Sequence, residues 1–231
     1  MWSRSELKEK AKIVLRVNYW QAFLVSLIIL ITGGSHNQGA GGAGAGGGES
    51  TFFNNQVAIV LGTIIILVII LRILIGYVLE VGGRKFFIKA AEGNSDPRYL
   101  AFGFRQNRYL DIFLTMFLRT IYLLLWTLLL IIPGIIKAYA YRMVPYILAD
   151  NPKIAHNRAI ALSNQMTKGE KLDIFILDLS FIGWFLLGSL ALGVGVLFVQ
   201  PYYDATNVEL YLKLRQKALV NGLTTKEELN I

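Results

Sequence analysis

Residues 57–79 read VAIVLGTIIILVIILRILIGYVL, and this stretch decides the fold class of the chain. It contains a single charged side chain, Arg72, and no proline. At about 1.5 Å per residue, a helix of this length crosses a hydrocarbon core of about 30 Å with some tilt. The stretch therefore predicts a transmembrane helix.

The composition of the whole chain agrees with a membrane protein. Of its 231 residues, 55% are apolar and 16% are charged, whereas soluble domains carry about 25% charged residues. The net charge is +8. In a membrane protein such a surplus of Lys and Arg marks cytoplasmic loops rather than a nucleic-acid interface. The absence of cysteine excludes a disulfide framework, a thiolate nucleophile and a cysteine-ligated metal.

The residues before this stretch predict an interfacial helix and a first span. Residues 3–6, SRSE, form a capping box. Residues 1–17 predict an amphipathic helix on the inner membrane surface, and a solvated helix that merely precedes the first span is the alternative. Residues 19–32 predict that span, with a cleavable signal peptide as the alternative. The apolar face of the amphipathic helix comprises Leu7, Ala11, Val14 and Leu15.

Residues 33–52 are dominated by glycine and predict a flexible external loop, because such a segment has little to bury on ordering. Glycine runs can hold phosphate, but here no Lys-Ser or Lys-Thr pair follows.

Downstream, turn residues divide the apolar sequence into further predicted spans. Pro133 and Gly134 predict a tight external turn, because proline cannot continue a helix and glycine permits the turn. A second break is expected near Gly188, where small residues also let helices approach closely. Asn151 and Pro152 predict a helix end at the inner face, since the residue before a proline is held extended. The predicted third to sixth spans are 110–132, 135–149, 172–187 and 190–211.

Two short motifs, Val144-Pro145-Tyr146 and Gln200-Pro201-Tyr202, both fall in return spans. They suggest that spans three and four duplicate spans five and six.

The basic residues predict the topology. Five of the 23 Lys and Arg lie in residues 1–17, six in 80–109, four in 150–171 and four in 203–231. The positive-inside rule places these segments together in the cytoplasm, which requires an even number of spans between them. Six spans meet this condition, whereas a single bent helix over 172–211 would give five.

The predicted fold is therefore an all-α polytopic membrane bundle of about six transmembrane helices plus the N-terminal interfacial helix. It forms one domain over residues 1–231. Segments 80–109 and 150–171, the tail 212–231 and both termini are expected in the cytoplasm.

Four basic residues fall inside apolar segments. Arg72, Arg119 and Lys137 lie where a side chain can snorkel toward the membrane surface. Arg142 lies mid-segment, where a charge costs about 3 kcal/mol and needs a partner or water. Asp178 is the preferred partner, and the other candidates are Asp173, Glu80 and Asp204. The pair is interpreted either as part of an ion or substrate path, or as a structural lock between hairpins. A shallow or re-entrant fourth segment would also relieve the cost.

No residue pattern predicts enzymatic chemistry. The two histidines, His36 and His156, have no second ligand at metal-binding spacing. The nucleophile motif G-x-S-x-G and nucleotide-binding motifs are absent from the sequence. No cofactor is expected. The basic segments are explained by topology and by anionic lipid, so nucleic acid is not expected as a partner.

Several motifs together resemble one known family. They are Ile132-Pro133-Gly134-Ile135-Ile136, the run from Tyr146 to Pro152 (YILADNP), and Met166-Thr167-Lys168-Gly169. The chain resembles an uncharacterised family of bacterial membrane proteins, found mostly in Gram-positive species, called domain of unknown function nine-seventy-five. The resemblance implies a multi-pass plasma-membrane protein, and it implies no activity and no catalytic residues.

Three functional hypotheses follow. The favoured one is a non-enzymatic membrane protein: a scaffold, an immunity or stress factor, or a partner subunit. Its partners would be anionic lipids of the inner leaflet, and other membrane proteins or a second copy of the chain. The alternative is a transporter, channel or transporter subunit that uses buried charges and broken helices. A membrane enzyme acting on lipid or peptide is the third, for which no site is visible.

Overall fold

The computed structural model describes residues 2–32, 55–105, 108–190 and 194–231. Over these residues the regular structure consists of helices only, which confirms the predicted all-α class. The predicted glycine-rich loop, residues 33–52 with His36, lies outside the described residues.

Helix α1, Arg4–Thr32, is bent at Asn18, whose backbone is not helical (φ −128°, ψ 28°). The bend falls at the predicted boundary between the interfacial helix and the first span. The Ser3 hydroxyl accepts a hydrogen bond from the Glu6 amide at 3.2 Å, as half of the predicted capping box. However, the predicted membrane-facing side is wrong. Leu7 and Ala11 are fully buried in the helical bundle.

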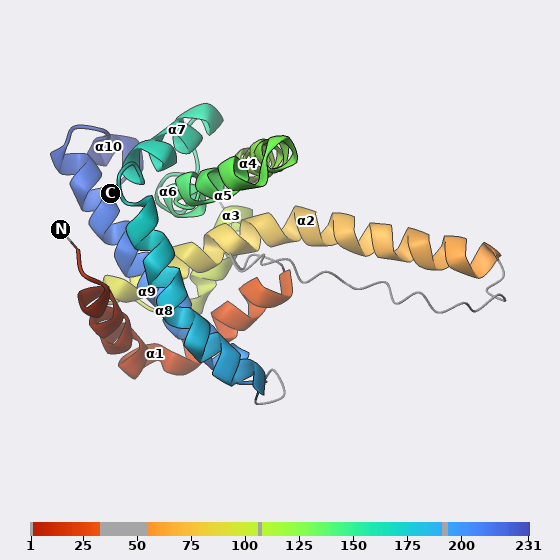
Figure 1. Ribbon diagram of the computed structural model, residues 1–231, viewed down its shortest axis with the longest axis horizontal. Coiled ribbons are helices and arrows are strands. Elements are labelled where there is room, and N and C mark those ends of the chain that lie inside the picture. The colour runs from red at the N-terminus through yellow and green to blue at the C-terminus, as the bar shows by residue number, and fades with distance from the viewer. Residues whose placement is uncertain (1, 33–54, 106–107, 191–193) are drawn as a thin grey trace.

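Helix α2, Asn55–Ala91, joins the predicted second span to the start of segment 80–109. Its amino half extends alone, away from the other helices, and its carboxyl half enters the bundle (Figure 1). The first part of segment 80–109 is therefore helical and mostly buried among the other helices. The predicted turn follows, with Gly93 at φ +92°. The short helices η1, Pro97–Ala101, and α3, Phe102–Arg105, complete the connection.

Helices α4, Tyr109–Leu129, and α5, Ile131–Ala140, form a hairpin. The predicted turn at Pro133 and Gly134 is misplaced, because the chain breaks at Leu130 in an extended conformation (φ −158°, ψ 137°). Pro133 lies in the first turn of α5, where its missing N–H loses no intrahelical partner. A Cβ at Gly134 would stand 2.8 Å from the Thr127 Cα, so the glycine permits the close return.

The predicted fourth span over residues 135–149 is not one helix. After α5 the chain makes a turn and then forms α6, Val144–Asp150, every residue of which is buried. Pro145 lies in the first turn of α6. The helix ends as predicted, since Asn151 before Pro152 is extended (φ −128°, ψ 100°). With 10 residues, α5 is only about 15 Å long, half the thickness of a hydrocarbon core.

Helix α7, His156–Met166, leads to α8, Lys171–Leu190, and α9, Val194–Val220. The predicted break near Gly188 is confirmed, because α8 ends two residues later. A Cβ on Gly188 would lie 2.8 Å from the Gly195 carbonyl carbon, so these glycines let α8 and α9 meet closely. Gly183, in contrast, faces open space. The last helix is α10, Lys226–Leu229, capped by Thr225.

The centre of the bundle is α9, which packs against α1, α2 and α8. Pro201 lies inside α9 without ending it, so it differs from Pro145 and does not support the suggested duplication. Among the described residues, three helices are long and apolar enough to cross a membrane: α1, α4 and α8.

Candidate functional site

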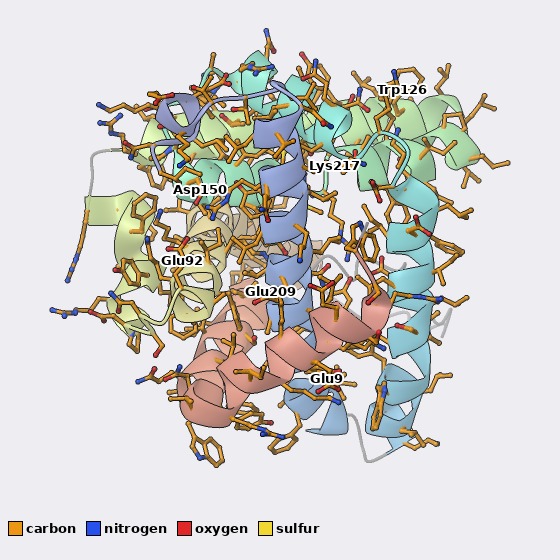
Figure 2. All side chains as sticks on the ribbon, turned by 90° about the vertical axis from the view of Figure 1, so that its left-hand side faces the viewer. Glu9, Glu92, Trp126, Asp150, Glu209 and Lys217 are labelled. Atoms are coloured by element: carbon orange, nitrogen blue, oxygen red, sulfur yellow. The ribbon has the colours of Figure 1, made fainter. Side chains whose placement is uncertain are left out.

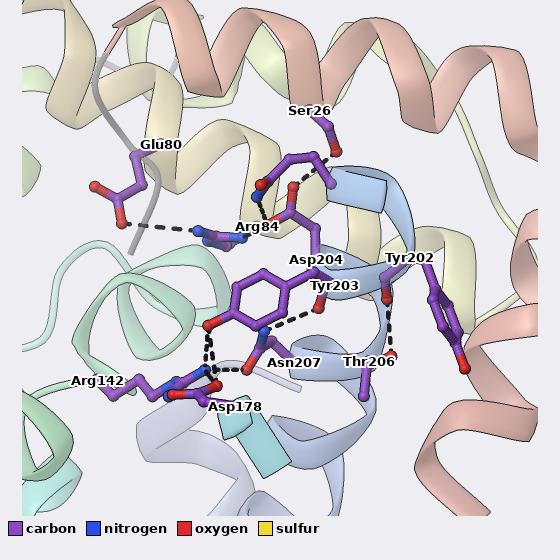
Figure 3. A network of polar contacts seen from close by, with 11 residues as sticks. Ser26, Glu80, Arg84, Arg142, Asp178, Tyr202, Tyr203, Asp204, Thr206 and Asn207 are labelled. Carbon is purple, nitrogen blue, oxygen red and sulfur yellow. Dashed lines mark hydrogen bonds and ion pairs between the residues drawn. The ribbon is translucent and has the colours of Figure 1, made fainter. Parts of the chain in front are cut away.

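The candidate site is a stripe of polar side chains along α9. Residues spaced three or four apart lie on one face of a helix, and this spacing relates the main members of the stripe. Together with Tyr203 they contact side chains from α1, α2, α8 and the turn before α6 (Figure 3), and also Asp150 of α6. The stripe comprises Gln200, Asp204, Asn207, Tyr211 and Arg215, with Tyr203 beside it.

The structure brings the predicted partners Arg142 and Asp178 into direct contact. The two terminal guanidinium nitrogens of Arg142 donate to the two Asp178 carboxylate oxygens at 2.5 and 2.7 Å. Tyr139 and Tyr203 donate their hydroxyls to the same carboxylate at 3.1 and 3.0 Å. Arg142 also donates to the Asn207 side-chain oxygen at 2.6 Å. We call this group the Arg142–Asp178 clamp.

Arg142 reaches this position because the helix breaks around it. The turn that carries Arg142 leaves backbone groups of the ended α5 and of the new α6 without helical partners. Ser163 on α7 serves both sides: its hydroxyl donates to the Ala140 carbonyl at 2.8 Å and accepts from the Met143 amide at 3.1 Å. The buried break is therefore stabilised by a side chain of a neighbouring helix.

A second clamp joins α1, α2 and α9. Arg84 donates to the Asp204 carboxylate at 2.7 Å, and both side chains are 1% exposed. Ser26 and Gln200 donate to the same carboxylate at 2.7 and 3.2 Å. Glu80, one turn before Arg84, lies 4.0 Å from its guanidinium. We call this group the Arg84–Asp204 clamp, and sequence reasoning missed it.

A third set of contacts lies farther along α9. Asp150, at the end of α6, accepts from the Tyr211 hydroxyl at 2.7 Å and from Arg215 at 2.9 Å. Arg215 also reaches Glu92, just beyond α2, at 3.4 Å. The three sets together attach five segments of the chain to one helix.

Of the other three basic residues in apolar segments, Arg119 lies differently from its prediction. Arg119 does not snorkel: it is 8% exposed and donates to the Tyr141 carbonyl at 3.1 Å. Lys137 has its ammonium 4.9 Å from the centre of the Trp126 ring, a cation–π distance. Arg72 stands exposed on the amino half of α2.

The energetics of buried ion pairs indicate what such clamps do. Moving two charges out of water costs several kcal/mol per ion. The attraction between the two charges offsets this cost when their hydrogen-bond geometry is good. Removing one partner then costs about 3–5 kcal/mol, since the other charge stays buried. The clamps thus contribute less to net stability than to fixing one arrangement of helices.

Within the described part of the chain, no group of three or more His, Asp or Glu side chains could hold a metal ion. His156 lies at the start of α7, where its Nδ1 is 2.6 Å from the Thr115 hydroxyl.

A family model described as protein of unknown function (DUF975) matches residues 1–138 and 127–218. The chain belongs to this family. The membership confirms the resemblance seen in the sequence motifs, and the matched residues include both arginine–aspartate clamps. No curated protein and no solved structure matches the chain.

The sequence motifs shared with DUF975 include some residues of the candidate site, such as Asp150, but not others, such as Arg84. The run from Tyr146 to Pro152 builds α6 and supplies Asp150. Arg84 had no comparable signal, because it lies in a basic segment that the charge rule explains without burial. The one sequence feature that could have indicated an ion pair at Arg84 is Glu80, which lies four residues earlier on the same helical face.

Proposed function

We propose that this chain is a multi-pass protein of the bacterial plasma membrane, with six crossings and both termini in the cytoplasm. One observation carries the proposal. The described side chains of α2 between residues 60 and 75 are largely aliphatic and exposed, whereas Glu80 and Arg84 in the same helix are buried. Soluble monomers rarely expose contiguous apolar patches larger than a few hundred Å². Lipid removes this cost, because its hydrocarbon is as apolar as the exposed side chains.

The count of six combines the basic segments with the helix pairs. Helices α4 and α8 are each long enough to cross, and each is followed by a returning helix. In this arrangement the fourth crossing is α5 plus α6, broken around Arg142. Its polar groups are tolerated there because other helices enclose them.

Labelling of single cysteines tests this topology, since the chain has no native cysteine. We expect Gly44→Cys to react with an impermeant maleimide on intact cells. Gln216→Cys should react only after permeabilisation. Labelling of Gln216→Cys on intact cells would rule out the six-crossing arrangement.

Within the membrane, the proposed role is a non-enzymatic scaffold or partner subunit, held in one shape for contact with other membrane proteins. The Arg142–Asp178 clamp supports this role. Four hydrogen bonds occupy the Asp178 carboxylate, so it is engaged in packing rather than held ready for a substrate.

A transporter or channel subunit is the second candidate, because the same buried charges could line a path. Asp178→Asn separates the two, with Asp173→Asn, an exposed change on the same helix, as control. A structural clamp predicts a lowered unfolding temperature in detergent for Asp178→Asn alone. Transport predicts unchanged unfolding with loss of cation flux into proteoliposomes.

A further inference from the structure

A groove lies where α1 crosses α9 beside the carboxyl end of α2. Its volume is about 380 Å³. Lys10, Lys213 and Glu209 bring charge to it, and Ile13, Val14 and Leu212 form apolar walls. Figure 2 shows Glu209 on α9 close to this crossing.

The charges in the groove are of both signs. Lys213 and Lys10 stand 2.7 and 3.4 Å from Glu6, which they share. Glu209 is 7% exposed, and no ion pair or hydrogen bond from the described residues holds its carboxylate. A largely buried carboxylate without a bonded cation is costly. The last turn of α2, ending at Ala91, adds the partial negative charge of a helix carboxyl terminus. The groove therefore offers an amine site beside two ammonium groups.

An exposed apolar stripe leads away from the groove along α1. Ile13, Val17, Trp20 and Leu24 are 62, 81, 70 and 55% exposed. Ile13 and Val17 lie one turn apart before the bend at Asn18, and Trp20 and Leu24 lie one turn apart after it. Ile13 belongs both to the stripe and to the groove wall. A ligand with a charged head and an apolar tail would match this continuous surface.

We propose that the groove binds the headgroup of an amino phospholipid of the inner leaflet, with its acyl chains along the α1 stripe. The lipid phosphate contacts Lys10 and Lys213, and its ammonium contacts Glu209. Charge complementarity selects this ligand. A purely anionic headgroup would leave Glu209 without a cation, and a lone cation would face both lysines. This inference rests on the proposed membrane location.

Lipid retention tests the assignment on the full chain. The protein is reconstituted in vesicles of equal phosphatidylethanolamine and phosphatidylglycerol, re-extracted in mild detergent, and its retained lipids are quantified by mass spectrometry. We expect about threefold to fivefold enrichment of phosphatidylethanolamine, which is the ratio given by one partly buried charge pair of about 1 kcal/mol. Glu209→Gln should return the ratio to that of the vesicle. Lys213→Met should lower retention of both lipids.

Glu9→Gln is the matched control, since Glu9 is an exposed carboxylate on α1 outside the groove. It should keep the enrichment of the unaltered chain. A vesicle-like ratio in the unaltered chain, or full enrichment in Glu209→Gln with unchanged unfolding temperature, would overturn the assignment. Displacement by water-soluble glycerophosphoethanolamine as readily as by the lipid would also overturn it. Resistance of the chain to carbonate extraction reports membrane integration separately, so the two proposals fail independently.

Discussion

In α2, the described side chains between residues 60 and 75 point mostly into open surroundings, whereas those between residues 78 and 90 are mostly enclosed by other helices. The exposed half is aliphatic apart from a few residues such as Arg72, and the enclosed half contains Glu80 and Arg84 as well as Phe86 and Phe87. For a protein in water, hydropathy alone would predict that the aliphatic half is buried and that the half with Glu80 and Arg84 is exposed. Under the proposed membrane location the two halves face different media, and the enclosed half shows that buried charge is tolerated where a specific partner is supplied.

The largest expected effect comes from the two arginines of this one helix. Arg84→Met leaves Asp204 buried without its cation, so we expect a loss of about 3–5 kcal/mol in the free energy of unfolding. Arg72→Met removes an exposed charge from an apolar surface and should cost nothing. Both changes in stability are measured as shifts in the unfolding temperature of the purified variants in the same detergent. Equal losses would contradict the distinction between the halves.

A charge placed in the exposed half tests its medium directly. Leu67 is 63% exposed, and in water Leu67→Asp would be tolerated. In lipid, a central Asp costs about 2.5–3.5 kcal/mol on the insertion scale. We therefore expect the membrane-integrated fraction after carbonate extraction to fall for Leu67→Asp and to stay unchanged for Leu67→Ala. Full integration of Leu67→Asp would argue that residues around 67 do not lie in the membrane.

Two glycines of α2 provide a smaller contrast. A Cβ on Gly82 would stand 2.0 Å from the Leu100 carbonyl oxygen, whereas Gly62 has nothing within 4 Å. Gly82→Ala forces backbone to move and should destabilise by about 1–3 kcal/mol. Gly62→Ala should leave stability unchanged or raise it slightly, because alanine favours the helix. Thermal unfolding of both variants checks this, and a tolerated Gly82→Ala would argue against the packing of η1 on α2.

The smallest effect concerns an ion pair that faces water. Arg158 donates to Glu228 at 2.6 and 2.9 Å, and this hydrogen bonding holds the pKa of Glu228 below its usual 4.5. The resulting stability is present above the unfolded-state pKa and is lost as the pH falls through the lowered folded-state pKa. Because the pair is about one-third exposed, we expect well under 1 kcal/mol.

The unfolding temperatures of the unaltered chain and Glu228→Gln should accordingly differ slightly at pH 7 and converge near pH 3. A difference that persists at pH 3 would show that Glu228 acts by packing and not by charge.

Much of the fold could be predicted, and the errors have local causes. The helix end at Pro152 and the break after Gly188 follow from backbone chemistry, and both are present. The bend at Asn18 falls between the two predicted N-terminal segments. The turn at Pro133 was misplaced because proline is equally suited to the first turn of a helix. Gly134 permits close approach rather than the turn itself.

Some residues of the candidate site could also be predicted from the sequence, and others could not. Arg142 and Asp178 could be paired from sequence because both lie well inside apolar segments and carry opposite charges. Tyr139, Tyr203 and Asn207 could not be assigned, since nothing in their spacing distinguishes a clamp member from an ordinary helical residue. Such contacts depend on how α5, α8 and α9 approach one another, which local pattern does not encode.

By itself, the sequence determined the helical class, the family and several helix ends, because hydrophobic length, proline and glycine act within a few residues of the chain. Only the tertiary structure decided which charges are buried, which side of α1 faces outward and where α2 changes its surroundings. Burial depends on helices that are distant in sequence. A charge such as Arg84 is stable inside only because Asp204, 120 residues later, lies within hydrogen-bonding distance.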